Sequence, residues 1–281
     1  MSSVTVFAWA VPALFQDSVV DHTWVTTYDN RKTRHATISD VVVADEHYWY
    51  CWGSFHPAGG TPKIADGFLG QGPADLDYAS CLCKPDVDSS ADPLACGTIF
   101  KYGIDGVCHQ LANQILWSTD PTGTAPATVQ LARGYWISHA LFGPYGKQPA
   151  AWAQRLTTCQ PVEGFDMNAA RAQSAKDGFE EHLQSALKGR HAEARIQSLL
   201  DRRRQLTAEV AKVQTDPALV GGAPSASDLN RLYASFLRDA AKILGDDDFE
   251  RVFDQRPKDE MNVVDPAVYD ASAAPGTQQG H

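Results

Sequence analysis

The chain has 281 residues, of which 43% are hydrophobic and 21% are charged, a composition typical of a globular protein. Its formal net charge of −10 argues against a nucleic-acid partner, because nucleic-acid-binding proteins usually present a basic face. No stretch approaches the roughly 20 consecutive apolar residues needed to span a membrane, so we expect no membrane span. We also expect no signal peptide, since no basic region precedes the apolar N-terminus. A bacterial cytoplasmic location and a secreted one both remain open.

The first 56 residues predict strands. Residues 4–11, 23–28 and 35–43 are rich in β-branched and aromatic side chains. Residues 29–32 have turn chemistry, which predicts a hairpin between the second and third of these strands. The aromatic run at 48–52 either extends the sheet or lines a pocket.

Residues 57–97 are rich in Gly, Pro, Asp and Ser and predict a loop-rich insertion. A helix is expected from about 108 to 117, followed by further strand over 128–142. Residues 1–160 are therefore predicted as an α+β domain, in which an antiparallel sheet packs against the helix that carries Cys108.

Beyond Gly164 the composition shifts to good helix formers. Helices are predicted at 168–187, 190–214 and 227–244, the last capped by Ser225 or Ser227. We expect a mainly α-helical domain over 165–256, with binding of a protein partner, ordering of a lid and self-association as its alternative roles. Residues 257–281 have the composition of a flexible tail.

Cys108 is the strongest candidate for chemistry. It follows Gly106-Val107 at the start of the predicted helix, where unpaired amide N–H groups and the helix dipole can lower the pKa of a thiol. A nucleophilic cysteine also needs a base within hydrogen-bond reach. His109 is adjacent along the helix and would not face Cys108. His22 begins a predicted strand and is the better candidate, with His35 as a cross-strand neighbour that could orient it.

Three segments carry a family resemblance: Asp21-His22-Thr23-Trp24-Val25, Arg34-His35-Ala36 and Val107-Cys108-His109-Gln110-Leu111-Ala112-Asn113. In their order, with histidine strands before the cysteine helix, they resemble the circularly permuted papain-like enzymes of the NlpC-type and lecithin:retinol acyltransferase-like groups. The resemblance implies a catalytic Cys108, His22 as base and His35 as orienting residue. The chain departs from the pattern at Val107, where the latter group usually has Asn, and in its Cys-rich segment 51–96.

The expected function is that of a cysteine hydrolase or acyltransferase, or thiol protease, acting on an amide or ester through a thioester intermediate. Peptide or peptidoglycan-type amides are favoured over lipids, so an acyltransferase or phospholipase acting on lipid is one alternative. A non-enzymatic α+β binding module with a helical interaction domain is the other. Residues expected to contact the substrate are Trp24, Trp49, Trp52 and His109.

No cofactor or metal is expected. Cysteine and histidine do cluster at Cys51, His56, Cys81, Cys83 and Cys96, but the spacing of one residue between Cys81 and Cys83 does not fit the paired ligands of structural zinc sites. Disulfides or free thiols are preferred there. A histidine metal site at His22, His35, His47 and His56 is weaker still, because no helical pair of histidines or carboxylate framework supports it.

Overall fold

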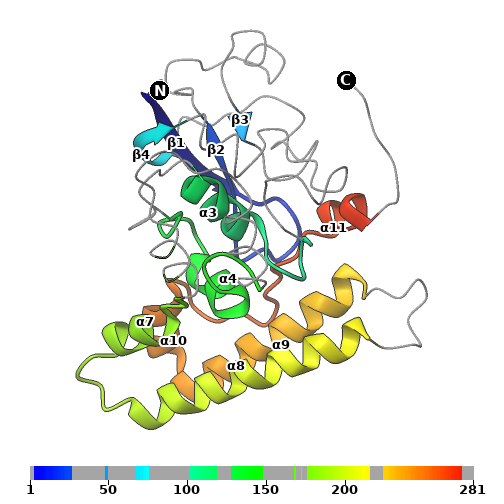
Figure 1. Cartoon of the computed structure of the whole chain (residues 1–281). Helices are drawn as coiled ribbons and strands as arrows, with labels where there is room; N and C mark the ends of the chain where they lie inside the picture. Colours follow the sequence, from blue (N-terminus) through cyan, green and yellow to red (C-terminus); the bar gives the residue numbers. More distant parts are fainter. Residues whose placement is uncertain are drawn as a thin grey trace.

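The computed structural model describes residues 3–26, 48–49, 68–75, 101–118, 128–147, 168, 172, 176–215 and 224–273. These residues form an α+β structure in which a small antiparallel sheet lies at one end and a pair of long helices at the other (Figure 1). None of the described helices has the length and the apolar composition that crossing a membrane would require.

The sheet has the strand order β3-β2-β1-β4. β1 (Ser3–Pro12) pairs with β2 (Asp21–Thr26), and this register places Val11 opposite His22. β3 (Tyr48–Trp49) extends the sheet beyond β2, as one interpretation of the aromatic run allowed. The predicted strands at 4–11 and 23–28 are confirmed within the described residues. The predicted strand at 35–43 and its hairpin lie outside them.

β4 (Phe68–Asp75) is a strand inside the segment predicted as a loop-rich insertion. The loop prediction was wrong for these residues because Gly70, Gly72 and Pro73 give the segment a low strand propensity. β4 pairs with β1 and ends the sheet. Proline is tolerated in an edge strand because its nitrogen can face solvent, where no neighbouring strand needs an N–H donor.

α3 (Cys108–Ser118) packs against β2 and confirms the helix predicted at 108–117. Its inner face is apolar, and Leu111 and Ile115 are completely buried. The N-terminus is closed by a side chain, since the N–H of Val107 donates to Oε1 of Gln110 at 3.0 Å. This bond, from the residue before the helix to the side chain of the third helical residue, is one of the two bonds of a capping box. It fixes where the helix begins.

α4 (Tyr135–Phe142) is a helix where the sequence favours strand. The prediction of strand at 128–142 was wrong because almost every residue of α4 is buried. A helix surrounded by core has no polar face, so periodicity cannot separate it from a buried strand. Gly134, at φ +75°, begins the helix and lies so close to the chain that an added Cβ would be 2.0 Å from the carbonyl oxygen of Val19.

The remaining helices are α7 (Phe179–Ala186), α8 (Glu193–Gln214), α9 (Ala226–Leu244), α10 (Asp246–Phe253) and α11 (Pro266–Ala273). α8 and α9 confirm two predicted helices, and Ser225 forms a capping box with Asp228. The helix predicted at 168–187 is interrupted, because residues 176–178 are not helical and α7 begins after Gly178.

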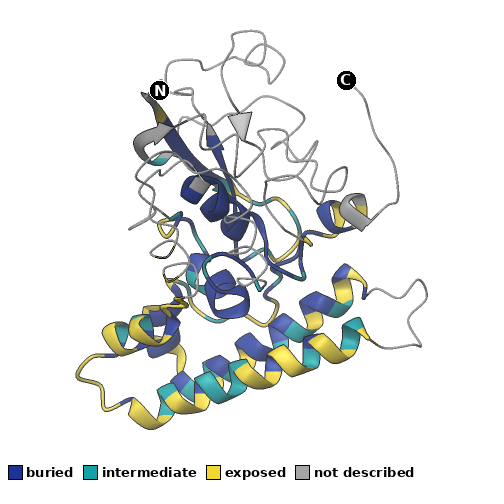
Figure 2. Cartoon of the chain, in the orientation of Figure 1, coloured by how far each residue is buried: buried dark blue, intermediate teal, exposed yellow. Residues whose placement is uncertain are grey.

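The two halves predicted as separate domains share one hydrophobic core. A single cluster of buried residues includes side chains from the sheet, from α3 and α4 and from α9 and α10. Figure 2 shows buried positions on each of these elements. The rings of Phe142 and Tyr233 meet edge to face with centroids 5.2 Å apart. The hydroxyl of Tyr233 also donates to the carbonyl of Gly103 at 2.7 Å. The helical region therefore supports the sheet region directly.

The segment after α10 is packed structure rather than a tail over the part that is described. Met261, Val263 and Val264 are buried, and α11 follows them. Residues 274–281 of the predicted tail lie outside the described residues. The side chain of Asn230 holds the segment, since it accepts from the N–H groups of Val263 and Val264 and donates to the carbonyl of Val264. Composition suggested a tail because the valines are too few to form a periodic pattern.

Candidate catalytic site

The structure brings His22 and Cys108 together. Cys108 is the first residue of α3, and His22 is the second residue of β2. Their side chains are both buried, with Nδ1 of His22 3.0 Å from Sγ of Cys108. This separation lies within the range for proton transfer between a nucleophile and its base.

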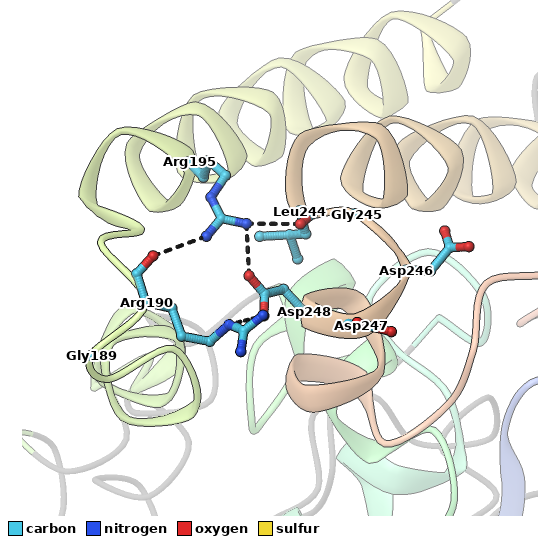
Figure 3. Close-up of a pocket in the computed structure, with 8 residues that line it drawn as sticks. All are labelled: Gly189, Arg190, Arg195, Leu244, Gly245, Asp246, Asp247 and Asp248. Carbon is cyan, nitrogen blue, oxygen red and sulfur yellow. Dashed lines mark hydrogen bonds and ion pairs between the residues drawn. The ribbon is translucent and has the colours of Figure 1, made fainter.

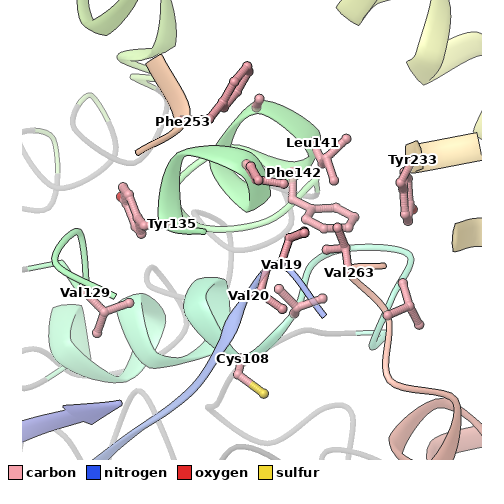
Figure 4. Packing of buried hydrophobic residues seen from close by; sticks show 14 of the residues in the cluster. Val19, Val20, Cys108, Val129, Tyr135, Leu141, Phe142, Tyr233, Phe253 and Val263 are labelled. Carbon is pink, nitrogen blue, oxygen red and sulfur yellow. The ribbon is translucent and has the colours of Figure 1, made fainter. Parts of the chain in front are cut away.

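A small cavity adjoins this pair. Its volume is about 10 Å³, which is room for about one water molecule. Figure 4 shows Cys108 at the start of α3, with Val19 and Val20 of the connection between β1 and β2 nearby. The cavity draws on segments far apart in the sequence: Ala13, Phe15, Val20, Asp21, His22, Tyr102, Val107, Cys108 and Asp265.

The start of α3 supplies a favourable field for negative charge at the sulfur. The first N–H groups of an α-helix have no acceptor within the helix, and the dipole is positive at this end. A backbone N–H at such a helix start is a suitable donor for an oxyanion that forms beside it.

Trp24 packs against the imidazole ring of His22. The two ring centroids are 5.6 Å apart with planes inclined by 26°, and Trp24 is completely buried. Trp24 therefore supports the His22 ring, and its predicted contact with a substrate stays a prediction.

Arg133 holds the chain that leads into His22. Its guanidinium donates to the carbonyls of Ser18 and Val20, each at 3.0 Å, and to Oδ1 of Asp21 at 3.1 Å. Two further bonds involve the backbone: the N–H of Arg133 donates to Oδ2 of Asp21 at 3.0 Å, and the N–H of Asp21 donates to the carbonyl of Arg133 at 2.9 Å. Asp21 directly precedes His22, so these five bonds determine where His22 enters the candidate site.

His109 has a structural role between α3 and α4, and its predicted contact with a substrate stays a prediction. It is completely buried, and its Nδ1 lies 2.8 Å from Oγ of Ser138 on α4. Burial lowers the pKa of His109 to about 3, opposed by a backbone hydrogen bond with Asp21. The ring is therefore neutral at neutral pH and links α3 to α4.

The other predicted site residues are not placed by the described structure. His35 and Trp52 lie outside the described residues, and Trp49 belongs to β3, where its side chain is not described. The cysteines and His56 of the zinc alternative also lie outside. Within the part of the chain that is described, no three His, Cys, Asp or Glu side chains are grouped to hold a metal ion, and Cys108 forms no disulfide.

Sequence reasoning missed Tyr102 and Asp265 as members of the site. The N–H of Asp265 donates to the hydroxyl of Tyr102 at 3.1 Å, and the Asp265 side chain accepts from the N–H of Ala267 at 2.9 Å. Asp followed by Pro266 is a recognisable helix-start signal. The Asp265-Pro266 pair predicts the start of α11, but no local sequence pattern shows that this helix start lies beside Cys108.

A larger cavity of about 550 Å³ lies beside the start of α8, the end of α9 and the start of α10 (Figure 3). Charged side chains in its wall form ion pairs with one another. Asp248 is buried there, and its carboxylate binds Arg190 at 2.5 Å and Arg195 at 2.7 Å. The residues around it include neither cysteine nor histidine: Gly189, Arg190, Arg195, Leu244, Gly245, Asp246, Asp247 and Asp248. The nucleophile and base therefore single out the smaller cavity as the candidate site.

Comparison with known proteins assigns no family: no family model matches the chain, and no curated protein or solved structure is significantly similar to it.

Proposed function

We propose that the chain is a cysteine-dependent hydrolase or acyltransferase that acts on an amide or ester through a thioester intermediate. The observation that carries this proposal is the distance of 3.0 Å between Nδ1 of His22 and Sγ of Cys108 at the start of a helix. A histidine and a cysteine in contact at a helix N-terminus are the elements of an activated thiol nucleophile.

The proposed reaction has two stages. His22 takes the proton of the Cys108 thiol, and the thiolate attacks the carbonyl carbon to form a C–S bond. The oxyanion is held by the N–H of Cys108 until the C–N or C–O bond breaks. The protonated His22 then gives its proton to the departing amine or alcohol. Water or another acceptor, deprotonated by His22, attacks the thioester and regenerates the thiol.

The chain order of the site supports the permuted papain-like resemblance. The strand that carries His22 precedes the helix that carries Cys108, and α3 packs directly on β2. We favour peptide-type amides as substrates, with lipid esters second.

The activated thiol can be tested by alkylation. We expect iodoacetamide to modify Cys108 faster than the same cysteine in the denatured chain, with reactivity persisting below the ordinary thiol pKa of about 8.5. Because the chain has six cysteines, the modified site is located by peptide mass spectrometry. His22→Ala should remove the enhanced rate, whereas His191→Ala, at an exposed position, should leave it unchanged.

The acyl intermediate can be tested with p-nitrophenyl acetate. A burst of p-nitrophenolate and an acetyl mass shift on Cys108 are expected, and both should be absent in Cys108→Ala. If Cys108 in the folded protein reacts no faster than the denatured thiol and forms no acyl adduct, the proposal is wrong and the binding-module interpretation replaces it.

A further inference from the structure

Asp265 is a buried carboxylate on the wall of the candidate site. It is 5% exposed and lines the same small cavity as Cys108 and His22. It directly precedes α11, and its side chain caps that helix by accepting from the N–H of Ala267. The mechanism proposed above gives this residue no task.

The position of Asp265 is rigidly determined. Its N–H donates to the hydroxyl of Tyr102, another residue of the cavity. The residues just before it are held by Asn230 through three hydrogen bonds. Asp265 therefore stays at the cavity through contacts that do not involve His22 or Cys108.

The two carboxylates of the cavity differ in how their charge is balanced. Asp21 forms an ion pair with Arg133, whose Nε lies 3.1 Å from Oδ1. Asp265, in contrast, forms no ion pair among the described residues, and its side chain accepts only the backbone bond from Ala267. A buried carboxylate without a counter-charge is energetically costly, so the cavity is more favourable for a cation than for an anion.

We propose that the site selects substrates with a positively charged group beside the reactive carbonyl, and that Asp265 supplies the counter-charge. This inference rests on the proposed function and assigns its substrate class: amides or esters whose acyl part carries an ammonium or guanidinium group. A cation from the substrate would neutralise the buried carboxylate, and in an enclosed site such an interaction is screened less than in water. An acyl group that carries a carboxylate would be repelled by Asp265.

Charge-selective thiol reagents measure this field at Cys108 directly. 2-Aminoethyl and 2-sulfonatoethyl methanethiosulfonate both form a disulfide with Cys108 and release methanesulfinate, but the first is cationic and the second anionic. We expect a larger cation-to-anion rate ratio in the folded protein than in the denatured chain. Asp265→Asn should reduce that ratio about tenfold, since focused fields in clefts change local ion concentrations by this order or more.

The Asn substitution isolates the charge because asparagine caps a helix as well as aspartate does. Asp259→Asn is the matched control: it removes the same charge from an exposed position six residues earlier in the same segment. It corrects for the general effect of the net negative charge of the chain. Equal ratios in the two variants would overturn the assignment of Asp265.

Ester substrates identify the kind of cation. The p-nitrophenyl esters of N-acetyl-lysine, of N-acetyl-norleucine and of glycine present a side-chain ammonium, a neutral chain and an α-ammonium. Each acylates Cys108 with release of p-nitrophenolate. We expect at least one cationic ester to acylate faster than the norleucine ester, and Asp265→Asn to remove the advantage. Faster acylation by the norleucine ester than by both cationic esters would contradict the substrate class.

Failure of this inference is distinguishable from failure of the proposed function. If Cys108 reacts rapidly with iodoacetamide but shows no selectivity that depends on Asp265, the nucleophile stands and the substrate class falls. If Cys108 is as slow as the denatured thiol with every reagent, the proposed function itself falls.

Discussion

The position of the His22 ring depends on residues that have no part in the proposed chemistry. Trp24 stacks on the imidazole ring. The guanidinium of Arg133 donates to three oxygens in residues 18–21, which directly precede His22. A base must be placed within a fraction of an ångström to be effective, and small misplacements cost large factors in rate. Arg133 is accordingly a positioning residue for His22.

Arg133→Lys should therefore slow the alkylation of Cys108 about tenfold and weaken its reactivity at acidic pH. An ammonium is a point donor and cannot reproduce the planar fork that reaches three separate oxygens. The measurement is the pH–rate profile with iodoacetamide, with thermal unfolding to confirm that the variant is folded.

Arg231→Lys is the control, because Arg231 makes its ion pair with Asp228 at the exposed end of α9. If the two lysine variants have the same pH–rate profile as the parent, Arg133 has no positioning role.

At the scale of elements, the start of α4 is joined to the segment that enters β2. Gly134 has φ +75°, and an added Cβ would lie 2.0 Å from the carbonyl oxygen of Val19. This close approach lets the backbone of Arg133 pair with Asp21. α4 thus helps to place His22, although it contributes no residue to the cavity.

Gly134→Ala should destabilise the protein by about 3 kcal/mol or more, because a backbone clash adds to the strain of a left-handed alanine. Urea unfolding gives the free energy. Cys108 alkylation should slow as well, since the connection 18–21 must shift.

Gly178→Ala is a matched control, since Gly178 has φ +73° and an added Cβ there would meet nothing within 4 Å. It carries the strain alone, about 1–2 kcal/mol. Equal losses in the two alanine variants would show that the contact with Val19 is not limiting.

Two buried imidazoles link α4 to other parts of the chain. His109 of α3 contacts Ser138 of α4, and Nε2 of His139 lies 2.5 Å from the carbonyl of Asp177. Burial lowers the pKa of His139 to about 4, against opposing contributions from Asp177. Both rings are held in the neutral form in the folded protein at neutral pH.

For the whole molecule, the lowered pKa values of His109 and His139 predict a loss of stability in mild acid. Below the unfolded pKa of about 6.5 the unfolded chain binds protons that the folded chain does not bind until pH approaches 4 for His139 and 3 for His109. The free energy of unfolding should therefore fall as pH decreases from 6.5 to 4, by up to about 1.4 kcal/mol per pH unit for each histidine.

Urea titrations at pH 7, 6, 5 and 4 measure this slope. His139→Gln retains a donor for the carbonyl of Asp177 and should make the decline shallower, whereas His191→Gln, at an exposed site, should not. A decline that is equally steep in both variants would exclude His139 as a cause.

The shared core explains why the helical region matters to the site. Tyr233 of α9 contacts both Phe142 of α4 and the carbonyl of Gly103. Asn230, on the same helix, holds the segment that presents Asp265. α9 thus contacts both chain segments that carry the cavity residues Tyr102 and Asp265.

Local patterns in the sequence were sufficient for the elements with a polar and an apolar face. α3 was predicted from its apolar periodicity, and α8 and α9 from their content of good helix formers; Ser225 with Asp228 also forms a capping motif readable over four residues. The approximate positions of β1 and β2 followed from β-branched and aromatic content. Cys108 could be recognised because its helix start is a local feature.

Tertiary structure decided the elements without such a pattern. α4 is buried all round, and β4 has a composition that only pairing with β1 makes a strand. The site divides in the same way. The sequence by itself determined a cysteine at a helix start and a histidine, His22, near a strand start. The fold decided that His22 meets Cys108, that His109 turns away to Ser138 and that Asp265 joins them. The physical reason is that periodicity and capping act between residues a few positions apart, whereas a cavity is formed by packing between distant segments whose contacts leave no local trace.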